Sequence, residues 1–126
     1  MNEELAAALD PVLRDLKATC AVRPVVQEER DDEGEEMIVL YESDGSGAGL
    51  VVRHGVSVAE RTADFADQAQ DWAVEALCAQ WEPAVWPECP THPDAHPLEA
   101  GVVEGVAVWS CPRTRKVVAP VGSLGS

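Results

Sequence analysis

The sequence predicts a mixed α+β fold in the order α-β-β-β-α with an antiparallel meander, followed by a β-hairpin module. Three observations support this order: an apolar stripe of helical spacing at each end of residues 1–80, three β-rich runs between the stripes, and a sharp rise in proline content after residue 80. The 126 residues suffice for one small domain with an appended module. We therefore expect an acidic α+β domain over residues 1–80 and a proline-rich module over residues 81–126 packed on it.

The first apolar stripe describes one face of a helix near the N-terminus. Its members follow the spacing i, i+4, i+7, i+8, i+11 and i+15: Leu5, Leu9, Val12, Leu13, Leu16 and Cys20. Asp10 followed by Pro11 has the signature of an N-cap and a first helical turn. The sequence predicts either a kinked helix from about residue 3 to 19 or a short turn that leads into a helix beginning at Pro11.

Three β-rich runs, over residues 22–27, 37–42 and 49–54, are expected to form an antiparallel three-stranded meander. Pro24 lacks an amide proton, which suits an edge strand. Residues 28–36 are almost all charged and predict a solvated hairpin loop, whereas residues 43–47 have the Ser, Asp and Gly composition of a compact turn.

A second helix is predicted over residues 58–80, because Ser57 and Glu60 form a capping box before a second apolar stripe. The stripe consists of Phe65, Ala69, Trp72, Ala73, Ala76 and Leu77. We expect both helices to cover one side of the meander, and Cys20 and Cys78 to be core thiols beside their apolar faces. Core packing is also the expected role of most of the four tryptophans, Trp72, Trp81, Trp86 and Trp109.

The proline-rich tail carries the pattern of a metal site. Cys89, His92 and His96 follow C-x2-H-x3-H, and Cys111 arrives after 14 intervening residues. Two thiolates and two imidazoles are the ligands of a closed tetrahedral Zn²⁺ site. Proline follows both cysteines, as in the knuckle turns of zinc ribbons, so we predict a structural zinc ion in a zinc-ribbon-like hairpin with strands at 105–110 and 116–119.

The fourth predicted ligand, His96, does not stand at the position of a zinc-ribbon ligand. A full zinc ribbon would place a ligand where Thr114 stands, and threonine is not a usual zinc ligand, so His96 is expected to replace it. The other histidine, His54, ends a predicted strand and is expected at the surface. A loop rich in proline and histidine with two buried cysteines and no metal is the simplest alternative.

A sharper alternative leaves His96 off the metal and makes Cys89, His92 and Cys111 an open three-ligand site of the catalytic type. Such a site needs a general acid or base beside the metal-bound water. Glu88 and Asp94 are close in sequence, but neither stands in an H-x-E or H-E-x-x-H motif.

Charge limits the partners of the chain. It has 23 acidic and 9 basic side chains, a formal net charge of −14, and 19 of the acidic and 6 of the basic groups lie in residues 1–86. This field repels nucleic acids and anionic lipid surfaces, whereas a basic partner protein would be attracted. Acidic residues at the N-terminus and the lack of a membrane-length apolar run predict a cytoplasmic protein. A Gly-rich phosphate loop and a G-x-S-x-G elbow are absent from the sequence, which favours a non-enzyme.

The tail motif Cys89-Pro-x-His92…His96-Pro-Leu…Trp109-x-Cys111-Pro, preceded by Asp71-Trp72-x-x-Glu75-x-Leu77, resembles a group of small uncharacterised actinobacterial proteins over about residues 65–122. This resemblance implies a metal knuckle and no particular activity. The α-β-β-β-α order is also similar, in topology alone, to type III secretion chaperones and related sensory regulators, which bind partner polypeptides on their sheet. The chain departs from that fold in its proline-rich metal insertion and in lacking a final helix.

The sequence thus favours a non-catalytic cytoplasmic protein-interaction protein of the adaptor, chaperone or immunity type, in which zinc holds together a tail too poor in apolar residues to fold alone. The alternative is a zinc-dependent hydrolase that uses the open Cys89/His92/Cys111 site. The coordination of His96 separates the two hypotheses.

Overall fold

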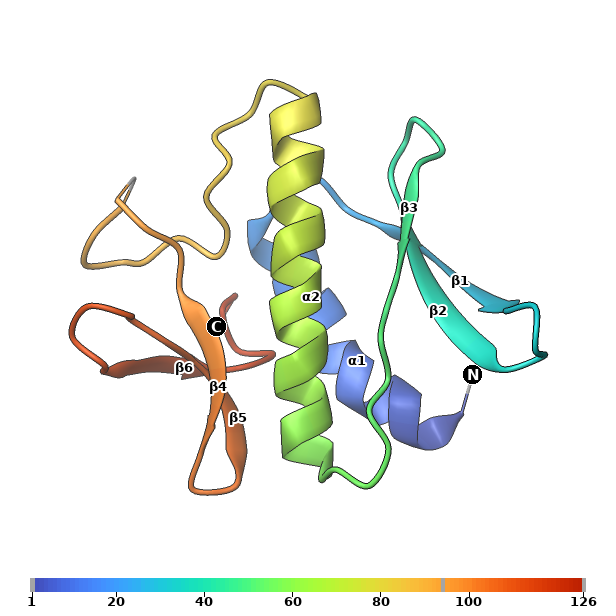
Figure 1. The fold of residues 1–126 in the computed structure, drawn as a ribbon. Coiled ribbons are helices and arrows are strands. Elements are labelled where there is room, and N and C mark those ends of the chain that lie inside the picture. The colour runs from blue at the N-terminus through green and yellow to red at the C-terminus, as the bar shows by residue number, and fades with distance from the viewer. Residues whose placement is uncertain (1, 94, 126) are drawn as a thin grey trace.

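The computed structural model describes residues 2–93 and 95–125, within which two helices lie between two antiparallel sheets (Figure 1). The elements in chain order are α1 (Glu3–Thr19), β1 (Val25–Arg30), β2 (Glu36–Tyr41), β3 (Gly47–Gly49), α2 (Val58–Ala79), β4 (Glu99–Val103), β5 (Val106–Ser110) and β6 (Val117–Pro120). The mixed α+β class is confirmed. The tail contains three strands where two were predicted.

Both helices begin at a side-chain cap. The carboxamide of Asn2 accepts a hydrogen bond from Glu4 N at 2.7 Å, and the Ser57 hydroxyl accepts one from Glu60 N at 3.1 Å, as the capping box predicted. The start of a helix at Pro11 is wrong, because α1 runs unbroken through this residue. Its buried face continues on both sides of the proline, so packing outweighs the one backbone hydrogen bond that proline removes.

The first sheet has the order β1-β2-β3, with β1 shifted three residues toward the C-terminus of the predicted strand. Pro24 therefore precedes the strand. The predicted loop at 28–36 shrinks to a turn, in which the Asp31 carboxylate accepts hydrogen bonds from the amides of Glu33 and Glu35, both at 2.9 Å. The third strand was predicted at 49–54 but lies at Gly47–Gly49. Beyond it, the Gln68 side chain on α2 takes the place of a strand partner for Val51, bonding its N at 2.7 Å and its O at 3.0 Å.

The second sheet has the order β4-β5-β6, and β4 was not predicted. Gly101 interrupts the β-branched pattern of this strand and weakens the sequence signal. Gly105, placed in a strand by the sequence analysis, instead forms a two-residue turn with Glu104. Both turn residues have positive φ, of 51° and 78°, as in the tight turns that match the twist of a β-hairpin.

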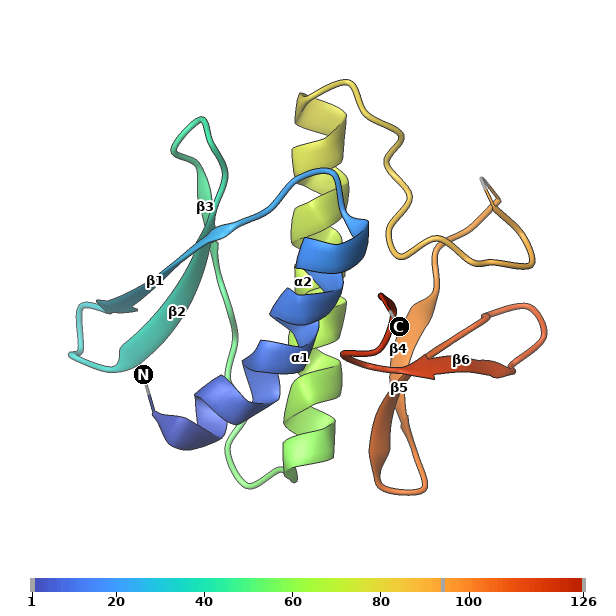
Figure 2. The same ribbon diagram turned by 180° about the vertical axis from the view of Figure 1, so that it is seen from behind.

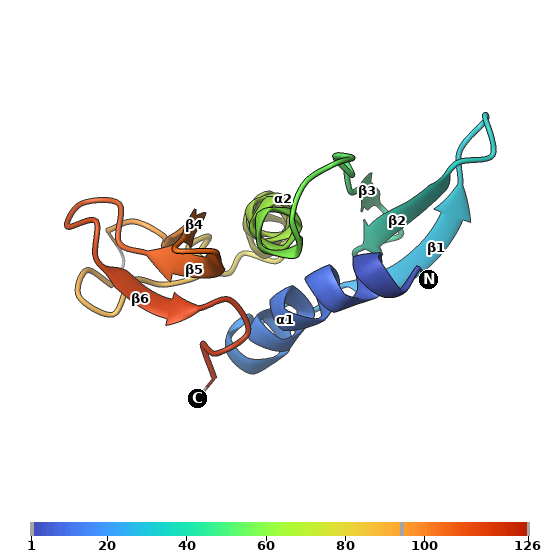
Figure 3. The ribbon, with the colours of Figure 1, turned by 90° about the horizontal axis from the view of Figure 1, so that it is seen from below.

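The helix pair separates the two sheets, so α2 packs between them rather than covering one sheet alone (Figures 1 and 3). One buried cluster joins all of these layers, with side chains from both helices and from both sheets. In the part of the chain that the structure describes, no helix is both long and apolar enough to cross a membrane.

The predicted core cysteines and the tryptophans differ in their burial. Cys20 is buried as predicted, whereas Cys78 is exposed, because it follows the buried Leu77 and points about 100° away from the core face. Three of the tryptophans are buried, and the fourth, Trp81, is 96% exposed just beyond the end of α2.

Candidate metal centre

The residues predicted as metal ligands lie on two segments that the fold brings together. Cys89, His92 and His96 lie on the loop between α2 and β4, and Cys111 follows β5 directly. The ends of the loop are joined by an isolated antiparallel bridge between Glu88 and Pro97, and by a backbone hydrogen bond. A turn from Cys89 O to His92 N, at 3.2 Å, carries the first imidazole back toward the first thiol.

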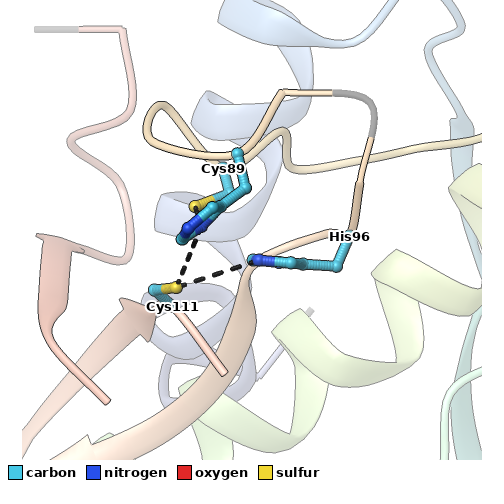
Figure 4. A group of neighbouring side chains, drawn as sticks. Cys89, His96 and Cys111 are labelled. Carbon is cyan, nitrogen blue, oxygen red and sulfur yellow. Dashed lines mark hydrogen bonds between the residues drawn. The ribbon is translucent and has the colours of Figure 1, made fainter. Parts of the chain in front are cut away.

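The four side chains form one compact cluster, each offering a ligand atom within 4.8 Å of the others (Figure 4). His92 Nδ1 lies 3.6 Å from both cysteine sulfurs, and His96 Nε2 lies 3.9 Å from Cys111 Sγ. In a tetrahedral zinc site with bonds of about 2.3 Å to sulfur and about 2.1 Å to nitrogen, sulfur and nitrogen lie about 3.6 Å apart. The cluster therefore has the size and donor atoms to hold a metal ion.

The tautomer of His96 favours its role as a ligand. Its Nδ1 lies 3.2 Å from the carbonyl oxygen of Pro97. A carbonyl can only accept a hydrogen bond, so in the neutral imidazole Nδ1 carries the proton and Nε2 keeps its lone pair. This lone pair is on the nitrogen nearest Cys111. A histidine that ligates a metal commonly donates its other N–H to such an acceptor.

Cys111 is the thiol best prepared for metal binding. The hydroxyl and backbone amide of Thr114 donate hydrogen bonds to its sulfur and, with the amide of Arg113, lower the pKa of the thiol to about 6. Thr114, which stands where a zinc ribbon would have a ligand, thus stabilises the thiolate instead. The knuckle is closed by hydrogen bonds from Cys111 N to Lys116 O at 2.9 Å and from Arg115 N to Cys111 O at 2.8 Å.

Two buried tryptophans connect the ligand-bearing segments to α1. Trp86, three residues before Cys89, donates from Nε1 to the Thr19 hydroxyl at 2.9 Å. Trp109, two residues before Cys111, donates to the buried carboxylate of Asp15 at 2.8 Å. The two indole rings meet edge to face with centroids 5.5 Å apart, so both halves of the site rest on one aromatic pair.

Helix α2 holds both ends of the ligand-bearing loop through the side chain of Gln70. Gln70 Nε2 donates to Trp86 O at 3.2 Å and to Leu98 O at 2.6 Å, which are the two ends of the ligand-bearing loop. Gln70, Asp15 and Thr19 were not predicted as part of the site. None of them left a clear signal in the sequence: Asp15 is buried, but it lies beside the predicted apolar stripe of its helix and not within it.

The structure describes two of the three other candidate groups, His54 and Glu88. His54 is exposed and outside the cluster, as predicted. Glu88 is exposed and lines a cavity of about 500 Å³, whereas Asp94 lies outside the described residues. Cys89 is the only ligand among the residues described as lining this cavity, whose wall is otherwise largely apolar.

The likeness of the tail motif to small actinobacterial proteins stays a prediction. No protein-family model matches the sequence, and it has no match among the curated proteins or the solved structures.

Proposed function

We propose that the chain is a non-catalytic, cytoplasmic protein-interaction protein of the adaptor, chaperone or immunity type, in which a structural Zn²⁺ ion holds the tail from residue 81 onward. The observation that supports this proposal is the convergence of all four donor atoms within 4.8 Å. Four protein ligands fill a tetrahedral shell and leave no position for water or substrate. Two thiolates also balance the charge of the ion.

The proposed partner is another protein with a basic surface. The chain has a net charge of −14, and the acidic groups concentrate in residues 1–86. Complementary charge increases the rate and the specificity of association more than it increases affinity. Nucleic acids and anionic membranes are unsuitable partners for the same field.

The alternative function is a zinc-dependent hydrolase with an open Cys89/His92/Cys111 site. One observation favours it: His96 lies slightly farther from Cys111, at 3.9 Å, than His92 does, at 3.6 Å. In that case His96 would orient a metal-bound water instead of coordinating the ion.

The substitution His96→Ala separates these functions, with His54→Ala as a matched control at an exposed histidine outside the cluster. If the site is structural, His96→Ala should weaken zinc binding at least about tenfold and lower the thermal stability of the tail, because a closed shell loses a ligand. Metal content by mass spectrometry and competition with a chelator measure the effect. Full zinc occupancy and unchanged melting of His96→Ala would instead favour the hydrolase.

A further inference from the structure

The two cysteines of the candidate metal centre lie close enough to react with each other. Both sulfurs lie 3.6 Å from His92 Nδ1 and within 4.8 Å of one another. The Cys89 thiol also donates a hydrogen bond to the Cys111 sulfur. A disulfide has a sulfur–sulfur bond of about 2.05 Å, so each sulfur needs to move by at most about 1.4 Å to form one. The pair, whose side chains point into the same cluster from two segments (Figure 4), is thus placed for a disulfide as well as for a metal ion.

Contacts that do not involve the metal ligands hold these two segments together. The loop between α2 and β4 lies beside the second sheet, on the same side of the helix pair (Figure 2). The rings of Trp86 and Trp109 meet with centroids 5.5 Å apart, and Gln70 bonds both ends of the loop. Groups held in this way react with each other far more readily than with groups on a second molecule. Oxidation should therefore join the two sulfurs within one chain.

A small reagent can approach each sulfur from the surface. Cys89 lines the cavity of about 500 Å³ beside Glu88, and Cys111 lines another of about 210 Å³ beside Arg115. Both cysteine side chains are themselves buried, which excludes bulky reagents. Hydrogen peroxide is little larger than water and oxidises thiolates directly. It is the class of oxidant that suits this arrangement.

The other two cysteines of the chain differ from this pair. Cys20 is buried at the end of α1, where burial raises the pKa of its thiol, and Cys78 is exposed on α2. Neither belongs to the cluster of donor atoms in the part of the chain that the structure describes. Cys78 therefore provides an internal reference, a thiol that a reagent reaches without entering the metal site.

We propose that Cys89 and Cys111 are a reversible redox pair, which hydrogen peroxide converts to an intramolecular disulfide that replaces Zn²⁺ as the link between the ligand-bearing loop and the end of β5. This inference rests on the proposed function, because it takes the cluster to be a structural zinc site. Disulfides of cytoplasmic proteins are usually transient, so cellular thiols should reverse the bond once the peroxide is consumed. The link within the tail thus responds to the oxidant.

The reaction begins with two thiolates, because cysteines are deprotonated when they bind a metal ion. First, the Cys111 sulfur, the less deeply buried of the two, attacks one peroxide oxygen. The S–O bond forms as the O–O bond breaks, which leaves a sulfenic acid and one hydroxide. The Cys89 thiolate then attacks the sulfenic sulfur, so that the S–S bond forms and a second hydroxide leaves. The two sulfurs lose two electrons, the peroxide gains them, and both hydroxides take protons from the solvent.

This exchange should release the ion and keep the tail ordered. After oxidation the two imidazoles of His92 and His96 remain as donors, too few to hold zinc in a closed shell. The disulfide closes the segment from residue 89 to 111 and so restricts the unfolded tail, whereas a chelator removes the link without replacing it. The oxidised, zinc-free chain and the chelated, reduced chain should therefore differ in the order of their tails.

The experiment uses the zinc-loaded full chain with Cys78→Ser, which keeps the cluster intact and removes the exposed thiol that could join two chains. Hydrogen peroxide in small excess should release about one zinc ion per chain, measured with a metal-binding dye. Mass spectrometry should then show a loss of about 2 Da in the metal-free chain and a cross-linked peptide containing Cys89 and Cys111. Dithiothreitol and zinc should reverse both changes. Cys20→Ala, added as a control, should give the same release and the same cross-link.

Limited proteolysis tests the replacement of one link by the other. A protease should cleave the oxidised tail at least about tenfold more slowly than the chelated, reduced tail. Equal cleavage of the two, or zinc release without the cross-linked peptide, would overturn the proposal. So would a zinc-loaded chain that keeps its ion at peroxide concentrations that oxidise the exposed Cys78 of the wild type, and this result would leave the proposed function intact. A purified chain that binds no zinc, measured before oxidation, would instead overturn the proposed function and the exchange with it.

Discussion

At the scale of single residues, Asp15 connects the two ends of the chain. It lies fully buried on α1, and its carboxylate accepts three hydrogen bonds: from the Trp109 indole at 2.8 Å, from Gly122 N at 2.6 Å and from Leu124 N at 3.0 Å. A buried carboxylate is tolerated only when it is hydrogen-bonded, and hydrogen bonds to a charged group are stronger than neutral ones. The tail is thus fixed to α1 by a polar contact at the centre of the molecule.

Removing this carboxylate should be costly. Asp15→Ala leaves three N–H groups, two of them buried, without an acceptor, and we expect the free energy of unfolding to fall by about 2–4 kcal/mol. Urea denaturation monitored by tryptophan fluorescence measures the change. Asp10→Ala, at an exposed position of the same helix, should alter stability by less than about 0.5 kcal/mol. Equal stability of the two variants would contradict the role given to Asp15.

At the scale of elements, the helices were predicted far better than the strands. The capping box and the stripe of α2 are local signals, and its predicted bounds of 58–80 differ from the observed helix by one residue. Strand β4 was missed, and β1 was misplaced by three residues, because a strand is defined by a partner that can lie anywhere in the sequence. The register of a hairpin also depends on turns such as the one at Glu104 and Gly105.

The candidate site was likewise predicted where its signal is local and missed where it depends on residues distant in the sequence. Spacing and residue type predicted the four residues that the fold gathers into one cluster, because both are encoded in short sequence segments. The groups that support them could not be found this way, since Gln70 lies 16 and 28 residues from the carbonyls it bonds. The role of Thr114 as a donor to the Cys111 thiolate also depends on the folded turn.

Helix α2 carries a row of like charges that opposes folding at neutral pH. Burial, followed by repulsion from Asp71, Asp64 and Glu99, raises the pKa of Asp67. A raised carboxyl pKa means that the folded state binds the proton more tightly, so ionisation of Asp67 lowers stability as pH rises through that pKa.

Asp67→Asn should therefore raise the free energy of unfolding at pH 7 by a few tenths of a kcal/mol, because the group is largely exposed and the repulsion is screened. The gain should disappear as pH falls below the carboxyl pKa, where the wild type is protonated as well. Urea denaturation across the acidic range measures this, with Glu33→Gln in the β1–β2 turn as a control. A gain that persists in acid would show that the charge of Asp67 is not its cause.

At the scale of the whole molecule, the two sheets depend on the helix pair in different ways. The first sheet and the segment that follows it pack Ile38, Leu40 and Leu50 into the core beside the helices, and none of the four candidate metal ligands lies in this part of the chain. The second sheet reaches the same core through Trp109 and through segments that the candidate metal site joins. The tail is expected to be the part whose order depends on the ion.

Chelation should consequently disorder the region from Trp81 onward and leave α1, α2 and the first sheet largely folded, because ligand binding supplies much of the folding energy of such a segment. The zinc-loaded protein should contain about one ion per chain. Limited proteolysis and tryptophan emission report the loss of order, and far-ultraviolet circular dichroism reports the retained helices. A Cys111→Ser variant should show little further response to the chelator. An ordered tail in protein free of transition metals would contradict the site.

The hydrogen bonds of Asp15 also set the order of the folding steps while the chain is being translated. Its partners lie 94, 107 and 109 residues farther along the chain, so α1 leaves the ribosome long before any of them exists. Until residues 109–124 have emerged, the carboxylate must stay in water, and the face of α1 that surrounds it cannot close. The docking of the tail on α1 is therefore postponed until the tail has been translated. A nascent chain stalled before Trp109 should leave the Asp15 side of α1 open to water and chaperones while α1, α2 and the first sheet are largely folded, as expected for the chelated protein.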